Sequence, residues 1–104
     1  PTPAAALAAA AVDIARALLT APEKAGTDHF AGREGASRAE FARAIFDVAG
    51  RDVAVEPIPT EAYPTPAPRP RDSRLDTTLI GEAFGIAAPD WRRGLAAILK
   101  EIDA

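Results

Sequence analysis

The chain of 104 residues contains no cysteine and only one histidine, and these absences exclude several kinds of site. Without cysteine there is no disulfide framework, no thiolate metal ligand and no cysteine nucleophile. Zinc sites need three or four ligands, and no second histidine or cysteine is present to join His29. We therefore expect no metal site and a structural role for His29. The lack of cysteine also favours a cytoplasmic location.

Serine and glycine motifs for catalysis or cofactor binding are missing as well. The chain has two serines, Ser37 and Ser73, and neither lies in a nucleophile elbow. The stretch "AGREG", residues 31–35, lacks the third glycine of a dinucleotide-binding turn, and no long strand precedes it. We expect no cofactor to bind to this chain alone.

Large side chains and clustered charge are also scarce. Apolar residues make up 48% of the chain, but many are alanine and only 6% of all residues are aromatic. We expect one domain with a small core, in which Phe41, Phe84 and Trp91 are the anchors. The net charge of -3 comes from interspersed acids and bases, which argues against a nucleic-acid or membrane surface. The N-terminal run is interrupted by Asp13 and Arg16, well short of membrane-spanning length.

Local signals predict four helices. Thr2 is a candidate cap for a helix that ends near Thr20. "SRAE", residues 37–40, is a capping box that begins a second helix, and Gly50 is suited to its end. The two remaining helices are expected to begin at caps Asp76 and Asp90, with Gly85 closing the first of them.

Two short strands are predicted between the helices. Residues 28–32, "DHFAG", are apolar at the centre and closed by glycine, which indicates a brief buried strand. Residues 52–58 alternate, but Pro57 removes a ladder donor, so that strand would be an edge or end there. The predicted fold class is α/β, rich in helix, with about four helices and one or two short strands.

The most unusual stretch is "YPTPAPRPRDSRLD", residues 63–76. Its prolines stand two residues apart, whereas peptide grooves that read polyproline need a spacing of three, so it is a poor peptide ligand. A rigid extended segment could instead deliver Arg69 and Arg74 to a diphosphate, because guanidinium groups bind phosphate bidentately. The alternative, that these arginines cover a surface or pair with Asp72 and Asp76, is equally compatible with the spacing.

This stretch, followed by "FGI", "PDW" and a terminal helix, resembles the C-terminal end of the dTDP-4-dehydrorhamnose reductase family, which are extended short-chain dehydrogenases. Upstream, "PTPAAALA", "DHFAG" and "SRAEFARAIF" follow the family pattern in the same order. The resemblance therefore spans nearly the whole chain.

The resemblance implies that residues 1–104 are the C-terminal substrate-binding domain of a reductase whose N-terminal Rossmann domain is absent from this chain. The intact enzyme would bind NADPH and reduce the 4-keto group of dTDP-4-dehydro-L-rhamnose with a Tyr-x-x-x-Lys pair. Here the one tyrosine, Tyr63, is followed four residues later by Ala67, so no catalytic residue is expected. The domain alone would be inactive, and the apolar face left uncovered would favour self-association into a homodimer.

The resemblance also implies site residues. Arg69 would contact the diphosphate of a dTDP-sugar, Ser73 and Arg74 would support it, and Tyr63 would shape the pocket edge. Some family members dimerise around magnesium, and Glu101 matches the position concerned, although we assign no metal there.

Four residues depart from the family pattern. Arg71 and Asp72 stand where the family usually has Gly-Asn or a similar pair, and an acidic residue at position 72 is unfavourable close to phosphate. Ala6 replaces a common acidic residue, and Arg38 replaces a frequent tryptophan.

The alternative hypothesis for the function is a small α-rich interaction module whose arginine cluster docks an acidic protein partner.

Overall fold

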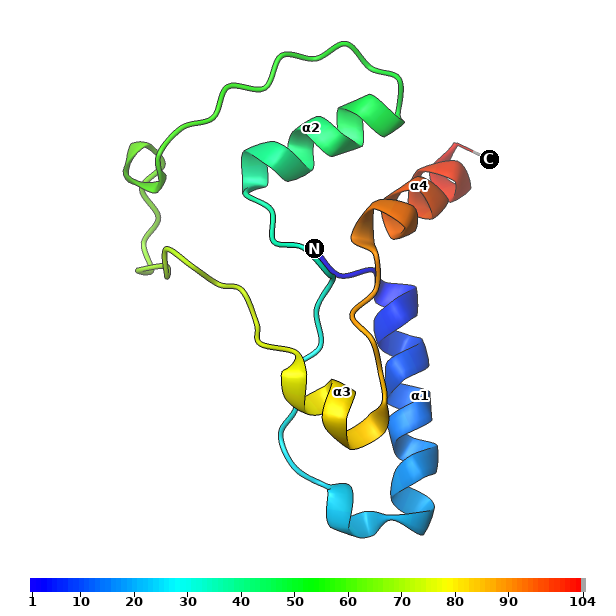
Figure 1. Ribbon diagram of the computed structural model, residues 1–104. Coiled ribbons are helices and arrows are strands. Elements are labelled where there is room, and N and C mark those ends of the chain that lie inside the picture. The colour runs from blue at the N-terminus through cyan, green and yellow to red at the C-terminus, as the bar shows by residue number, and fades with distance from the viewer. Residues whose placement is uncertain (104) are drawn as a thin grey trace.

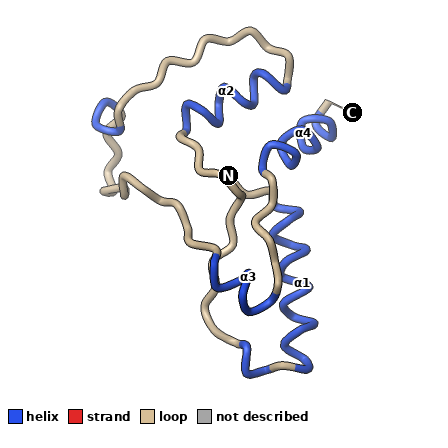
Figure 2. Tube along the Cα trace, in the orientation of Figure 1, coloured by secondary structure: helices blue, strands red, loops and turns tan. Residues whose placement is uncertain are grey.

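The computed structural model describes residues 1–103, and these form helices joined by irregular segments (Figure 2). The α-helices and the two 3-10 turns are, in chain order, α1 (Ala4–Thr20), η1 (Pro22–Lys24), α2 (Arg38–Val48), η2 (Thr60–Ala62), α3 (Thr78–Phe84) and α4 (Trp91–Ile102). The expectation of four helices is confirmed.

Neither predicted strand is present among the described residues, so the α/β prediction is confirmed only in its helix-rich part. The only β pairing in residues 1–103 is an isolated parallel bridge between Arg33 and Asp90. Residues 28–32 run extended but have no partner strand, and His29 is exposed rather than buried. Residues 52–58 are likewise unpaired, because Pro57 and Pro59 remove donors and no neighbouring strand lies beside them.

Most of the helix ends follow the local signals. The Ser37 side chain accepts a hydrogen bond from the Glu40 amide at 3.1 Å, and the Glu40 carboxylate accepts one from the Ser37 amide at 2.6 Å. Gly50 and Gly85 have positive φ angles of 65° and 66°, as expected just beyond α2 and α3. Asp90 caps α4 by accepting from the Arg92 amide at 3.0 Å.

Two predicted caps differ in the structure. Pro3, not Thr2, occupies the cap position of α1, and the Thr2 hydroxyl instead accepts a hydrogen bond from the Gly32 amide at 3.1 Å. The cap position of α3 falls on Thr77, one residue after Asp76. Asp76 still satisfies the first turn of α3, because its carboxylate accepts from the Thr78 amide at 2.9 Å.

The core lies where α4 meets α2. Among the described residues, the buried side chains are Ala10, Ala44, Ile80, Trp91 and Leu95. Trp91 packs edge-to-face on Phe41, with ring centroids 5.6 Å apart, and donates its indole N–H to the Glu34 carbonyl at 3.1 Å. The expectation that Trp91 and Phe41 are anchors is thus confirmed, and Phe84 is half-buried.

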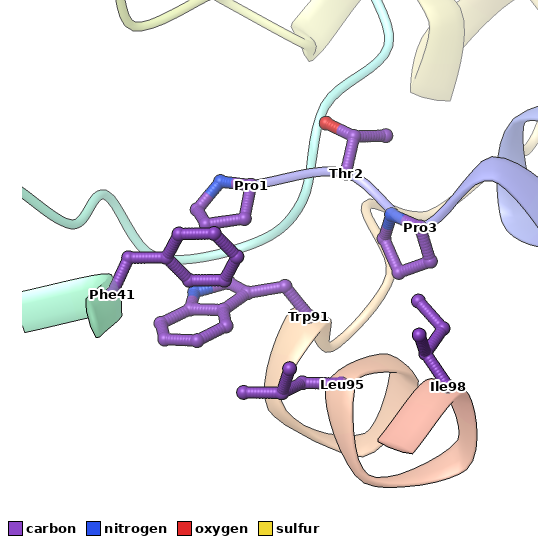
Figure 3. A pocket seen from close by; sticks show the side chains of 7 residues that line it. All are labelled: Pro1, Thr2, Pro3, Phe41, Trp91, Leu95 and Ile98. Carbon is purple, nitrogen blue, oxygen red and sulfur yellow. The ribbon is translucent and has the colours of Figure 1, made fainter. Parts of the chain in front are cut away.

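The first three residues complete this core. Figure 3 shows Pro1 above the rings of Phe41 and Trp91, with the Pro3 ring directed toward Ile98. These residues line an apolar pocket of about 250 Å³. A Cβ atom at Gly32 would collide with the Pro1 backbone, and one at Gly94 would collide with the Pro3 ring. The N-terminal segment therefore fits only because glycine occupies both positions.

The molecule is open rather than compact. Segment 51–77 leaves α2, runs as a wide arc away from the helices and returns at α3 (Figure 1). The radius of gyration is 16.8 Å, against about 13 Å for a compact domain of this length. The accessible surface is 8148 Å², whereas a compact protein of this mass exposes about 5,500 Å². The arc and its flanks account for the open shape, since residues 56–76 are all exposed.

Candidate functional site

A polar pocket of about 430 Å³ lies where the N-terminus, the segment before α2 and the end of the arc meet. It differs from the apolar pocket in that polar and charged side chains contribute to its walls. Its lining residues are Pro1, Thr2, Ala31, Gly32, Arg33, Glu34, Gly35, Ala36, Ser73, Arg74, Leu75, Thr77 and Ala88. Residues 1–2, residues 31–36, residues 73–75 with Thr77, and Ala88 therefore build this polar pocket from four separate parts of the chain.

The structure brings together two of the four predicted site residues. Ser73 and Arg74 both line the polar pocket. Arg69 and Tyr63 do not line it; both are exposed on the arc, and Tyr63 keeps 69% of its surface accessible. The geometry thus brings Ser73 and Arg74 to the pocket and leaves Arg69 and Tyr63 outside it.

Arg74 is held by its neighbour Asp72. The Arg74 Nε lies 2.9 Å from Asp72 Oδ1 and 3.1 Å from Oδ2, and Nη2 lies 2.6 Å from Oδ2. The Arg74 backbone amide donates to the same Oδ1 at 3.0 Å. The carboxylate therefore occupies the Nε–Nη2 edge of the guanidinium, while Nη1 makes no hydrogen bond to residues 1–103.

This ion pair changes the acidity of both partners. The side-chain and backbone hydrogen bonds from Arg74 lower the pKa of Asp72 from its ordinary value of 3.8 to about 2. The same hydrogen bonds and charge raise the pKa of Arg74. Asp72 is therefore fully ionised at neutral pH, and the alternative pairing with Asp72 that the sequence left open is present for Arg74.

The other arginines near the pocket differ in their pairing. Arg71 pairs with Glu61 at 2.9 Å, and Arg33 pairs with Asp90 at 3.6 Å. Arg69 makes no ion pair or side-chain hydrogen bond with residues 1–103. Its guanidinium therefore keeps all five donors available to a ligand.

Gly35 gives Arg74 its place in the pocket wall. A Cβ atom at Gly35 would lie 2.8 Å from Arg74 Cδ and 4.0 Å from Nη1. The arginine stem thus crosses closely over the Gly35 backbone, with Nη1 near this glycine. An alanine at position 35 would push the stem away.

The sequence analysis did not identify the wall formed by residues 31–36. Glu34 in this wall has a φ of 65°, which is uncommon for a residue other than glycine. Its carbonyl accepts the Trp91 indole hydrogen bond, which helps to hold this conformation. The signal available was "AGREG" itself: closely spaced glycines mark a tight backbone approach even where no dinucleotide motif is present.

The described residues do not fit a nicotinamide dinucleotide. Dinucleotide pyrophosphate normally binds the free amides of a helix that follows a parallel strand. Here no strand precedes α2, and its Glu40 amide is already taken by Ser37. In residues 1–103 no group of three acidic or histidine side chains is placed to hold a metal ion, and Glu101 has no such companions. No helix in that range has the length and apolar character needed to cross a membrane.

Comparison with known proteins connects this chain to a family. The profile of the RmlD substrate binding domain matches residues 1–104. A dTDP-4-dehydrorhamnose reductase from Aggregatibacter actinomycetemcomitans is 41% identical over 100 residues, covering 83% of this chain and 34% of that protein. The enzyme of the same name from Sinorhizobium fredii is 37% identical, covering 97% and 38%. The one from Escherichia coli K12 is 34% identical, covering 98% and 36%.

The match covers the whole of this chain but only part of each relative. The chain spans a little over a third of the length of these reductases. A family profile that matches from the first residue to the last shows membership directly. The chain belongs to the RmlD substrate-binding domain family and corresponds to the substrate-binding part of a dTDP-4-dehydrorhamnose reductase.

Proposed function

We propose that this chain binds the dTDP-sugar in an NADPH-dependent reductase that converts dTDP-4-dehydro-L-rhamnose to dTDP-L-rhamnose in the cytoplasm. A Rossmann portion, corresponding to the rest of the relatives' length, would supply the cofactor site and the catalytic tyrosine and lysine. The described residues contain neither, so the chain alone would be inactive. The observation that carries the proposal is the polar pocket, in which Ser73 and Arg74 face the 31–36 wall.

Within this proposal the arginines have different roles. Arg74 lies in the pocket wall and offers Nη1 to a ligand. Arg69 lies on the exposed arc with no internal partner, so it can bind a diphosphate placed between this domain and the Rossmann portion. Tyr63 would reach the ligand only from the arc, at the edge of the complete site.

The rival hypothesis of an interaction module has less support. An acidic partner would need several unpaired arginines on one surface, yet Arg71 and Arg74 are each paired with a carboxylate of this chain. The exposed apolar side chains, such as Leu19 and Ile102, instead suit a cover by the Rossmann portion or by a second copy in a homodimer.

The test is titration of the chain, joined to the Rossmann portion of a relative, with dTDP. We expect Arg69→Ala and Arg74→Ala each to weaken binding about tenfold, since a charge-assisted hydrogen bond contributes about 1.5 to 3 kcal/mol. Arg16→Ala on the exposed side of α1 is the matched control and should leave binding unchanged. Equal binding by all four proteins would contradict the assignment, and absence of NADPH-dependent reduction of the 4-keto sugar would contradict the activity.

A further inference from the structure

Asp72 is the residue that a phosphate site explains least well. Its carboxylate lies beside Arg74, one of the two arginines that line the polar pocket. A negative charge there opposes the approach of any anionic ligand. Yet the contacts of Asp72 are among the shortest and most numerous side-chain contacts in the described chain.

The geometry of this pair resembles that of a bound anion. Carboxylate and phosphate both use two oxygens to accept two parallel N–H donors of one guanidinium edge. Asp72 does this on the Nε–Nη2 edge of Arg74. A phosphate that binds the Nε–Nη2 edge of Arg74 must therefore replace the two carboxylate oxygens of Asp72.

The charges around the pocket also oppose the binding of an anion. Its two arginines, Arg33 and Arg74, are each paired with an aspartate, Asp90 and Asp72. Glu34 is the other charged side chain in the wall and has no ion pair within residues 1–103. In the 104-residue chain the Pro1 amino group adds one positive charge, which Glu34 balances, so the pocket has no net positive charge to attract an anion.

We propose that Asp72 is an intramolecular competitor that occupies Arg74 until the phosphate of a ligand displaces it. The inference rests on the proposed function, because it assumes that the pocket receives a nucleoside diphosphate group. Asp72 then sets how strongly the site selects for anions. A weakly charged group does not release Arg74, whereas a diphosphate, with more charge and more oxygens than a carboxylate, does. Displaced from Arg74, Asp72 is free to turn to solvent, since it is exposed.

The pair is weak enough to be exchanged. The side chains of Arg74 and Asp72 are 76% and 58% exposed, and exposed ion pairs contribute little to stability. Both residues lie outside the helices and the core, so neutralising Asp72 leaves the fold in place.

The probe is inorganic pyrophosphate, titrated into the 104-residue chain by calorimetry at low salt. Asp72→Asn should bind it about three- to tenfold more tightly than the unaltered chain, because a unit charge at close range changes binding by about one kilocalorie per mole or more. Glu61→Gln is the matched control: it removes the same charge and releases Arg71, which is outside the pocket. This control should change the affinity less than twofold.

Two further measurements separate competition from a general charge effect. The gain from Asp72→Asn should vanish in the Asp72→Asn, Arg74→Ala double variant, because it acts through Arg74. The carbon-13 signal of the Asp72 carboxyl should shift in the same direction on adding pyrophosphate to the unaltered chain as on substituting Arg74 by alanine, because both separate Asp72 from the guanidinium. Circular dichroism verifies that each variant keeps its helices.

Three outcomes would overturn the proposed competition. Equal affinity of the unaltered chain and Asp72→Asn, with loss in Arg74→Ala, would overturn the competition and leave the proposed binding function standing. An equal gain in Glu61→Gln would also overturn it. If neither the unaltered chain nor Asp72→Asn binds pyrophosphate, the competition is overturned, and the titration of the chain joined to the Rossmann portion decides separately on the proposed binding function.

Discussion

Glu34 shows at the scale of a single residue how the pocket wall is held. It adopts the left-handed conformation that glycine adopts without cost, and the Trp91 indole fixes its carbonyl. Side chains other than glycine adopt this conformation at a cost of about 1 to 3 kcal/mol, which the surrounding contacts must offset. Backbone strain of this kind cannot be predicted from the sequence, because none of the residues around Glu34 requires a positive φ at this position.

Replacing Glu34 by glycine should therefore stabilise the chain. We expect Glu34→Gly to raise the free energy of unfolding by about 0.5 to 1 kcal/mol, since relief of the strain exceeds the extra entropy of glycine in the unfolded state. Urea denaturation measures the change. The control is Glu82→Gly inside α3, which should lower stability by about 1 kcal/mol. A destabilised Glu34→Gly would show that the side chain itself contributes to the fold.

The Asp72 pair predicts a dependence on acid. The folded-state pKa of Asp72 is about 2, below the ordinary 3.8, so its contribution to stability is present above pH 3.8 and is lost as the pH falls through about 2. A carbon-13 titration of the Asp72 carboxyl should show this low midpoint. In Arg74→Ala the midpoint should return toward 3.8, and an unchanged midpoint would exclude Arg74 as the cause.

At the scale of elements, the sequence predicted what depends on neighbours in the chain and failed where a distant partner decides. The capping box at Ser37 and the glycine at position 50 act within a few residues, so their patterns were sufficient. The strand at 28–32 needed a partner strand that the fold does not provide. Thr2 was misassigned because the Gly32 amide, which its hydroxyl binds, lies 30 residues away. For the same reason the sequence identified Arg74 as a site residue but not residues 31–36, which form the pocket wall beside it.

The capping box should make a measurable contribution to α2. We expect Ser37→Ala to lower the free energy of unfolding by about 1 kcal/mol, since the Glu40 amide loses its acceptor. The matched control is Ser73→Ala, at the only other serine of the chain. Ser73 caps no helix, so the control should change stability by less than 0.5 kcal/mol, a limit typical of surface positions. Thermal unfolding followed by circular dichroism distinguishes the two, and equal effects would contradict the role of the cap.

Glycines at equivalent places in two helices should respond in opposite ways. Gly94 in α4 and Gly81 in α3 are each the fourth residue of their helix. Alanine at position 94 would collide with the Pro3 ring and should destabilise the chain by about 1 to 3 kcal/mol, despite its better helix propensity.

At position 81 the nearest atom to a Cβ is the Ile86 carbonyl oxygen at 3.6 Å, an ordinary contact. Gly81→Ala should therefore stabilise α3 by up to about 1 kcal/mol. Melting temperatures of the two variants measure the difference. Stabilisation by both substitutions would mean that the Pro3 ring does not contact α4 closely at Gly94.

At the scale of the whole molecule, the excess of exposed surface is the main feature. The radius of gyration of 16.8 Å and the arc 51–77 describe a domain with little of its own core. The sequence indicated a small core from its few aromatic residues, but the arc was not predictable in shape. Its prolines fix local backbone angles, and nothing local fixes the path between them.

Hydrogen exchange should separate the arc from the helices. Amides of residues 54–59 and 67–73 make no hydrogen bond within residues 1–103 and should exchange at close to the rate of an unfolded chain. Amides in the middle of α2 and α4 should be protected, because these helices share the Trp91 core. Mass spectrometry after brief deuterium labelling resolves both groups. Protection of the arc equal to that of α4 would contradict the open structure.

The packing of Pro1 and Pro3 against Gly32, Gly94 and Trp91 also bears on the order in which contacts form during folding. Residues 1–3 are far in sequence from Trp91 and Gly94, so these contacts close a long loop. Closing such a long loop is entropically costly, and contacts of this kind form late and slow the folding reaction. The contacts of residues 1–3 with α4 should therefore form after the local turns of the helices.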